Sequence, residues 1–382
     1  MDVNVNASLP ELQIVSIMSV PPLKVTDPRK FRQVLLSDPS FNTSTIDGCY
    51  QICLYYDKMK EEDHDGWHLA GWIVESLAMV LLEHPLLAGR LHRREVGDFE
   101  IVSNDSGIRL LEAMYPICLA EFLVLNEKEN LEGELVFWKE IDDHFPQFSP
   151  LFYVQASTLC LCKCSVTNFE CGGYSIGISC SLLLAEVLVV ENFLKKWSEI
   201  HNKMLPNNEV MKTPMAIFSH PHVKNHDLLP SHIINRTITK KNEVKNLVFK
   251  ITTEGVDFNQ GLWRELAMHC VEGAEKKLHI KMGSDFSLLV KESFEVIKVE
   301  TCSKGGYSMQ GLCLNNQITC TTWNDFGVYE VAFQEGNKPV HVSHWIGSVV
   351  NGHVMAFPCS KKNVSAAIVV SPPLQTNINH LH

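Results

Sequence analysis

The chain has 382 residues, of which 45% are hydrophobic and 20% charged, a composition typical of globular proteins with enough apolar material for a core. The net charge of −11 excludes the clustered positive charge on which nonspecific nucleic-acid binding depends. No apolar run approaches the roughly 20 residues of a membrane-spanning helix, and residues 1–19 lack the basic and apolar regions of a signal peptide. We therefore expect a protein that is not secreted, does not bind nucleic acid and meets a membrane only through a partner.

Apolar periodicity predicts a mixed α/β fold in which strands and helices do not alternate regularly. In the first half, strands are predicted at 10–24, 52–56, 108–113, 148–155 and 174–180. In the second half, they are predicted at 247–252, 329–333, 340–345, 352–357 and 365–370. Amphipathic spacing predicts helices at 66–83, 185–200 and 263–274.

A polar stretch between His201 and His232 contains four prolines and separates these two halves. Such a composition is typical of a linker between two units. We predict an N-terminal lobe at 1–205, a crossover linker at 206–235 and a C-terminal lobe at 236–382.

Thirteen cysteines are an odd number in a long chain without a secretion signal, which favours buried, reduced thiols over a disulfide framework. Cys160, Cys162 and Cys164 alternate in an apolar segment, but no second pair of ligands stands at the distance that a zinc site requires. We predict no metal site.

Several short motifs follow one another in a specific order. They are Leu-Leu-Ala-Gly-Arg-Leu at 86–91, Asn-Asp-Ser-Gly-Ile-Arg at 104–109, Phe-Glu-Cys-Gly-Gly-Tyr-Ser-Ile-Gly at 169–177 and Gly-Asn-Lys-Pro at 336–339. In this order the chain resembles the BAHD family of plant acyltransferases over nearly its whole length. The resemblance implies a two-lobed α/β fold like that of chloramphenicol acetyltransferase, with a central channel for acyl-CoA and an alcohol or amine.

The resemblance places the family's catalytic His-x-x-x-Asp motif a few residues after Gly177. Its histidine would be the general base that deprotonates the acceptor, and its aspartate would hold the local backbone through an ion pair. In this chain the two positions hold Leu182 and Glu186, and none of the 17 histidines has an aspartate four residues later. A leucine side chain accepts no proton, so we expect no transferase catalysis from this site.

The family's second signature, Asp-Phe-Gly-Trp-Gly, falls between a Tyr-Glu-Val segment and a Lys-Pro pair. In this chain that slot holds Ala332, Phe333, Gln334, Glu335 and Gly336. The Asp-Phe-Gly at 325–327 matches the letters but precedes the Tyr-Glu-Val segment. Both signatures are therefore degenerate in the same chain.

One branch of the family, the eceriferum and glossy proteins of plant cuticular wax formation, resembles this chain more closely than the working transferases do. The similarity rests on 104–109 followed by Glu112-Ala113, on Phe-Ser-Pro-Leu at 148–151, on Lys-Thr-Pro at 212–214 and on the eroded slot at 332–336. It implies an accessory protein beside a membrane-bound ketoacyl-CoA synthase of the fatty acid elongase. It also implies a place at the cytosolic face of the endoplasmic reticulum or in the cytoplasm, with acyl-CoA as a ligand and no permanently bound cofactor.

Two other interpretations stay open. The chain would be an acyl-CoA-dependent O- or N-acyltransferase for acyl groups other than amino-acyl groups, with Glu186 or a water as base, or a degraded product without function. Residues 156–165 are additional to the family pattern within a core strand, and the segments near 249–263 and 284–308 are short of it. For Leu182 the sequence allows two environments, the lining of an acyl-chain tunnel and a filled core.

Overall fold

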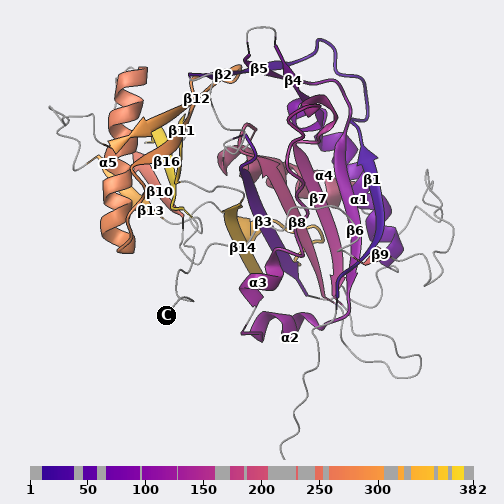
Figure 1. Ribbon diagram of the computed structural model, residues 1–382. Coiled ribbons are helices and arrows are strands. Elements are labelled where there is room, and N and C mark those ends of the chain that lie inside the picture. Colours follow the sequence, from indigo (N-terminus) through magenta and orange to yellow (C-terminus); the bar gives the residue numbers. More distant parts are fainter. Residues whose placement is uncertain are drawn as a thin grey trace, which may run out of the picture.

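The computed structural model describes residues 11–37, 46–57, 66–94, 97–126, 128–159, 173–184, 187–204, 229–230, 246–252, 258–304, 317–321, 328–347, 352–359 and 364–373. Within these ranges the chain forms two β-sheets with helices packed against them (Figure 1). This confirms the predicted α/β fold built in two lobes.

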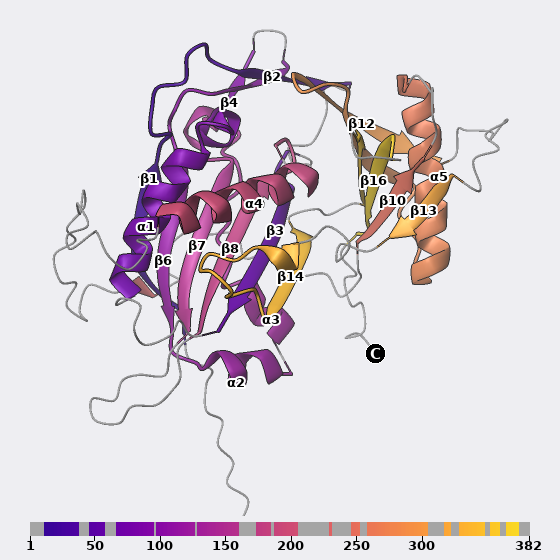
Figure 2. The ribbon, with the colours of Figure 1, turned by 180° about the vertical axis from the view of Figure 1, so that it is seen from behind.

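The first sheet, sheet A, has seven strands in the order β14-β3-β8-β7-β6-β1-β9. In chain order they are β1 (Gln13–Val20), β3 (Cys49–Tyr56), β6 (Ile108–Tyr115), β7 (Phe152–Leu159), β8 (Gly173–Ser181), β9 (Leu229–Pro230) and β14 (His341–Gly347). Helices α1 (Gly66–Val80) and α4 (Val187–Met204) lie side by side over one face (Figure 2). The central strands β3 and β8 are buried at every residue, because both faces of the sheet are covered.

The second sheet, sheet B, has nine strands in the order β13-β10-β16-β15-β11-β12-β2-β5-β4. They are β2 (Phe31–Leu36), β4 (Arg90–Arg93), β5 (Phe99–Val102), β10 (Leu247–Ile251), β11 (Asp285–Lys291), β12 (Val296–Ser303), β13 (Ile318–Thr321), β15 (His353–Pro358) and β16 (Ala366–Ser371). Helix α5 (Gln260–Leu278) packs against β16, β15 and β11. It begins at Asn259, whose side chain accepts a hydrogen bond from the Leu262 amide at 2.9 Å, as an N-cap residue does.

Five short elements complete the described fold: η2 (Pro85–Ala88), α2 (Leu119–Val124), α3 (Lys128–Glu132), η3 (Pro146–Phe148) and η7 (Val328–Glu330). None of the helices in the described ranges combines the length and the apolar character needed to cross a membrane. The eight cysteines of these ranges are free thiols.

Each sheet contains strands from both halves of the chain. Strands β2, β4 and β5 belong to the first half but extend sheet B, where β2 pairs in parallel with β12. Strand β14 belongs to the second half but forms the edge of sheet A, antiparallel to β3. Most of the predicted linker at 206–235 lies outside the described residues, and the predicted lobe boundaries stay a prediction.

The largest core cluster is continuous between the two sheets. It holds side chains of sheet A, such as Val154 and Ile178, together with side chains of sheet B, such as Leu289 and Met355. Burial of this shared apolar surface stabilises the contact between the lobes by roughly 25 cal/mol per Å².

Two predictions about strands were wrong. The strand predicted at 329–333 is the short helix η7 followed by a loop, because side chains rather than a neighbouring strand bind its backbone: the Tyr56 hydroxyl donates to the Val331 carbonyl at 2.9 Å. The strand predicted at 148–155 is shifted, since β7 runs to Leu159 and pairs with β8 along its full length. The first residues of the additional segment at 156–165 therefore continue the strand, and 160–165 lie outside the described residues.

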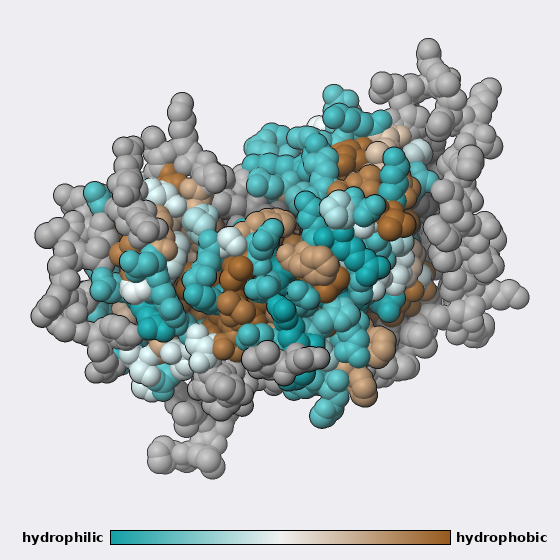
Figure 3. All heavy atoms as spheres, turned by 90° about the horizontal axis from the view of Figure 1, so that it is seen from above, coloured by the Kyte–Doolittle hydropathy of each residue, from teal (hydrophilic) through white to brown (hydrophobic). Residues whose placement is uncertain are grey.

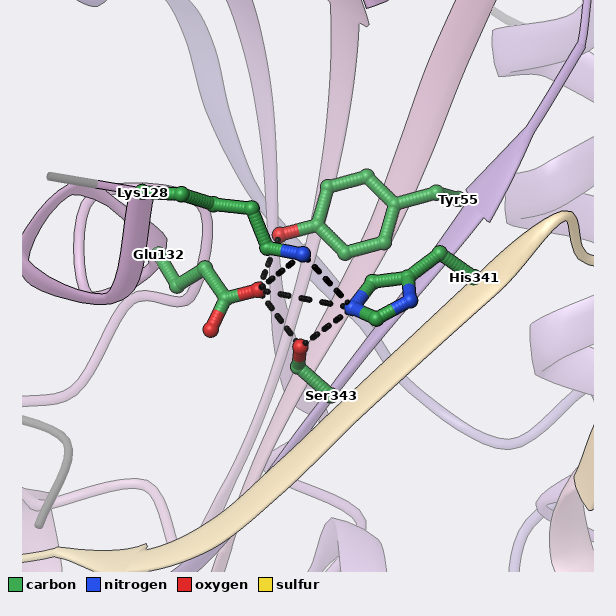
Figure 4. A network of polar contacts seen from close by, with 5 residues as sticks. All are labelled: Tyr55, Lys128, Glu132, His341 and Ser343. Carbon is green, nitrogen blue, oxygen red and sulfur yellow. Dashed lines mark hydrogen bonds and ion pairs between the residues drawn. The ribbon is translucent and has the colours of Figure 1, made fainter. Parts of the chain in front are cut away.

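A buried polar network links β14 to its neighbouring strand β3 and to helix α3 (Figure 4). The side chain of Glu132 is fully buried on α3, and its Oε1 accepts from the Ser343 hydroxyl at 2.5 Å and from the Tyr55 hydroxyl at 3.3 Å. Lys128 Nζ lies 3.8 Å from the same oxygen and donates to His341 Nε2 at 2.9 Å. Serine, histidine and carboxylate occur together here, but the serine hydroxyl donates to the carboxylate and is buried, so the arrangement is structural.

We predict that Glu132→Ala destabilises the protein by about 3 kcal/mol, because it removes the buried carboxylate that accepts from two buried hydroxyls and faces the partly buried Lys128 ammonium. Urea denaturation followed by circular dichroism measures this loss. The matched control Glu199→Ala removes an exposed carboxylate from α4 and should change the unfolding free energy by less than about 0.5 kcal/mol. Equal stability of the two variants would contradict the role assigned to the network.

Candidate functional site

The residue at the position of the expected catalytic base, Leu182, begins the turn between β8 and α4. Its amide donates to the Gly48 carbonyl at 2.9 Å, and the Leu184 amide donates back to the Ser181 carbonyl at 2.9 Å. The side chain is 1% exposed and belongs to the largest core cluster, together with those of Leu183 and Leu184. Of the two environments that the sequence allowed, this packing fits the filled core.

The strand that leads to this turn carries a glycine for a steric reason. A Cβ at Gly177 would collide with the backbone carbonyl of Leu135 and with the Val136 side chain. The close approach explains why the motif at 169–177 ends on glycine at this point of β8.

A buried guanidinium holds the turn from the side of sheet B. Arg32 on β2 donates through Nη1 to the Leu183 carbonyl at 3.3 Å and through Nε to the Phe294 carbonyl at 2.9 Å, in the loop between β11 and β12. Burial lowers the pKa of Arg32 to about 10, so the side chain remains a cation at neutral pH. The contacts of Arg32 tie the turn of sheet A to a hairpin of sheet B.

The expected partner in the motif, Glu186, lies outside the described residues. Among the described residues, no carboxylate forms an ion pair with Arg32. The turn is therefore held through a backbone carbonyl by a cation that sequence analysis missed.

A carboxyl group with a raised pKa stands beside the turn. Asp47 precedes Gly48, whose carbonyl receives the Leu182 amide, and its Oδ1 accepts from the Ile141 amide at 3.2 Å. Burial raises the pKa of Asp47 to about 7, with smaller contributions from the negative charges of Glu140 and Asp143. Among the described residues near the turn, this is a group able to exchange a proton at neutral pH, and no motif indicated it.

The segment at 332–336, where the second signature was expected, packs against α4 and β3. Phe333 is fully buried, with its ring centroid 4.4 Å from that of Trp197 and 6.0 Å from that of Tyr56. The Asn202 side-chain amide donates to the Ala332 carbonyl at 2.5 Å. Gln334 and Glu335 are half-buried and exposed, and Gly336 has a φ of +80° in the tight turn that follows. The structure therefore assigns packing, rather than chemistry, to 332–336, and the Asp-Phe-Gly at 325–327 lies outside the described residues.

A buried histidine lies beneath this segment. His201 Nδ1 lies 3.0 Å from the Ser76 hydroxyl, which donates to the Ile73 carbonyl and accepts from the Trp197 indole at 2.8 Å. Burial lowers the pKa of His201 to about 4, so the ring is neutral at physiological pH. Since the serine proton is already committed to a carbonyl, this serine–histidine pair serves packing and not nucleophilic chemistry.

No group of histidine, cysteine, aspartate and glutamate in the described ranges could hold a metal ion. The structure thus brings together Leu182, Arg32 and Asp47 around the turn between β8 and α4. The segment at 332–336 packs against the C-terminal part of α4, at Trp197 and Asn202.

We predict that Asp47→Asn abolishes one component of the pH dependence of stability. In the folded state Asp47 keeps its proton to about pH 7, whereas an unfolded aspartate loses it near pH 3.9. The folded state therefore binds more protons between these values, and the stability of the wild type falls as pH rises through this window. Asparagine retains the oxygen that accepts from Ile141.

Thermal melting from pH 4 to pH 8 measures the effect. The variant should match the wild type near pH 4 and melt at a higher temperature near pH 8. Asp47→Ala, which loses the acceptor as well, should melt lower at pH 4. A constant offset between wild type and Asp47→Asn at every pH would contradict the raised pKa.

Comparison with known proteins gives a family match and partial matches to curated relatives. The family model described as "Transferase: Transferase family" matches residues 36–260, more than half of the chain. Protein ECERIFERUM 26-like of Arabidopsis thaliana is 26% identical over 123 residues, which cover 32% of this chain and 26% of that protein. Taxadien-5-alpha-ol O-acetyltransferase of Taxus cuspidata is 30% identical over 133 residues, covering 34% of this chain and 27% of that enzyme. The alignments therefore span about a quarter of these curated relatives.

Among solved structures, the crystal structure of vinorine synthase is similar to this chain with a TM-score of 0.47 and 14% sequence identity. The superposition covers 96% of this chain and 95% of the other.

Proposed function

Since the chain belongs to the Transferase family, the BAHD family that its motifs resemble, we propose that it is a noncatalytic relative that promotes elongation of very-long-chain fatty acids for cuticular wax. In this proposal its partner is a ketoacyl-CoA synthase of the fatty acid elongase. It would work at the cytosolic face of the endoplasmic reticulum, with acyl-CoA as a transient ligand.

The observation that carries this proposal is the buried hydrocarbon at Leu182. Within a family that transfers acyl groups, the loss of a general base typically costs about 10²–10⁴ in rate. Leu182 offers no lone pair, and its side chain is sealed in the main core. The backbone of the turn is nevertheless held in place at Gly48 and Arg32, so the scaffold remains while the base is absent.

The curated relatives support the branch only coarsely. Two proteins named ECERIFERUM 2 and ECERIFERUM 26 match about a third of the chain at 26% identity. Taxane acyltransferases match similar lengths at 30–33% identity. The choice of the wax branch therefore rests on the motifs at 104–113, 148–151 and 212–214 and on the degenerate sites.

Asp47 favours a second candidate, an acyl-CoA-dependent O- or N-acyltransferase. Its carboxyl group has a pKa of about 7 and stands one residue from the carbonyl that binds Leu182. A base of this pKa is suited to proton transfer at neutral pH. Purified protein that transfers acyl groups from acyl-CoA, and loses this activity in Asp47→Asn, would establish this candidate and exclude the first.

The first test is co-expression with a ketoacyl-CoA synthase in a host that makes no wax, followed by gas chromatography of the acyl chains. We expect longer chains than the synthase makes alone, and the same lengthening with Leu182→Met, which keeps the volume and the lack of a base. A product profile identical to that of the synthase alone would contradict the accessory role and favour a chain without function.

The second test restores the motif with Leu182→His and Glu186→Asp together. An imidazole in this apolar position costs about 1–3 kcal/mol of stability, so folding is first checked by thermal melting. We expect no acyl transfer from acyl-CoA by the wild type or by folded Leu182→Met. Transfer by wild-type protein at an ordinary enzymatic rate would contradict the noncatalytic assignment, whatever the double variant does.

A further inference from the structure

The segment between β1 and β2 and the first residue of β2 expose apolar side chains at one end of the molecule. Leu23 and Val25 of the segment are 59% and 81% exposed, and Phe31 of β2 is 48% exposed. Figure 1 shows this indigo segment crossing the top of the molecule from β1 of sheet A to β2 of sheet B. Seen from above in Figure 3, apolar and hydrophilic side chains intermingle on this end.

The segment is held firmly against the fold. The Leu23 amide donates to the Ala78 carbonyl of α1 at 2.9 Å, and the Thr26 amide and hydroxyl donate to the two carboxylate oxygens of Asp105 at 2.9 and 2.6 Å. Lys30 and Ser103 exchange two further hydrogen bonds, of 2.7 and 3.0 Å. The exposed side chains therefore project from a preformed backbone.

Two further apolar side chains are exposed near the point where Leu23 binds α1. They are Met79, next to Ala78, and Leu82 in the turn after the helix, which are 37% and 42% exposed. We call Leu23, Val25, Phe31, Met79 and Leu82, with the cations among them, the basic–apolar strip.

The charge of the strip is opposite to that of the whole protein. Residues 23–31 contain Lys24, Arg29 and Lys30 but one acid, Asp27, and the Asp105 carboxylate bound to Thr26 brings their net charge from +2 to +1, in a chain of −11. The three cations are exposed, and none of them forms an ion pair with a carboxylate in the described part of the chain. They are therefore available to an external anion.

We propose that the basic–apolar strip is a membrane contact that binds an anionic lipid surface. Apolar side chains insert between lipid headgroups while the cations meet lipid phosphates and carboxylates, and binding grows with both contributions. The strip exposes few apolar side chains, whereas a stable protein interface buries about 1,000 Å² or more with good complementarity. A lipid surface needs no shape match, so it suits these few projecting groups.

This contact belongs to the chain itself and departs from the expectation that it meets a membrane only through a partner. It does not depend on the proposed function. It would orient the molecule with the loop between β1 and β2 toward the bilayer, so that the strands of sheet A run away from the membrane surface.

The experiment is flotation of the purified full chain with two kinds of vesicle, phosphatidylcholine alone and an equimolar mixture of phosphatidylcholine and phosphatidylserine. We expect binding to the mixed vesicles that weakens with added salt, and little binding to the neutral ones. Replacing one cation should weaken binding about fivefold, so Lys24→Glu with Lys30→Glu should reduce it by a factor of about 25 or more. Leu23→Ser with Val25→Ser should also weaken binding, but without changing its salt dependence.

Matched controls come from other exposed surfaces. Lys276→Glu on α5 changes charge equally per site, and Val124→Ser at the end of α2 removes an equally exposed apolar group. Both should bind mixed vesicles as the wild type does, and thermal melting shows that all variants are folded. Equal binding to neutral and mixed vesicles, or unchanged binding in the strip variants, would overturn the proposal.

The outcome is separable from that of the function tests. No ketoacyl-CoA synthase is present in the vesicle assay, so its result bears on the strip alone. Conversely, chain lengthening without vesicle binding would overturn the strip and leave the accessory role intact.

Discussion

The arrangement around Leu182 depends on the hydrogen bonds of the buried Arg32 guanidinium. It joins a carbonyl in the turn after β8 to a carbonyl in the hairpin between β11 and β12, and so links sheet A to sheet B at the point where the family carries its chemistry. A nearly buried cation is costly to desolvate, and its contacts with carbonyl dipoles offset part of that cost. Arg32 holds the turn through the Leu183 carbonyl, and among the described residues no carboxylate pairs with its charge.

The packing around this turn involves residues from several parts of sheet A and α4. Gly177 still allows the Leu135 backbone to approach β8, and Phe333 still packs on Trp197 at the far part of α4. Leu182, at the position where the resemblance places the catalytic histidine, is packed by its surroundings as part of the core. The packing of the turn is therefore complete with a hydrocarbon at this position.

The sequence was a good guide where an element has a regular apolar face or forms an unbroken apolar run. Helices α1 and α4 were predicted from amphipathic spacing, and strands such as β8, β15 and β16 were predicted as short apolar runs that are buried along most or all of their length. Strand β2 was missed, since the inward-facing Arg32 interrupts its apolar pattern. Strands β4 and β5 are too short for a period to be recognised.

For the candidate site, motif spacing identified Leu182 and the slot at 332–336, whose positions relative to glycine and Lys-Pro are local in sequence. Arg32 and Asp47 were missed because their roles depend on residues far along the chain. Arg32 binds a carbonyl 151 residues away, and Asp47 binds an amide 94 residues away. Neither distance leaves a signature in a single sequence, and a raised carboxyl pKa arises only from burial in the folded state.

The position of β14 at the edge of sheet A has a consequence for biosynthesis. Its residues leave the ribosome almost 300 residues after those of β3, yet they cover the side of that strand, which is buried along its whole length. Until they arrive, the nascent N-terminal sheet presents an unpaired apolar edge, which is the kind of surface that recruits chaperones or aggregates. Premature termination anywhere before His341 would therefore damage the half of the molecule that had already been synthesised.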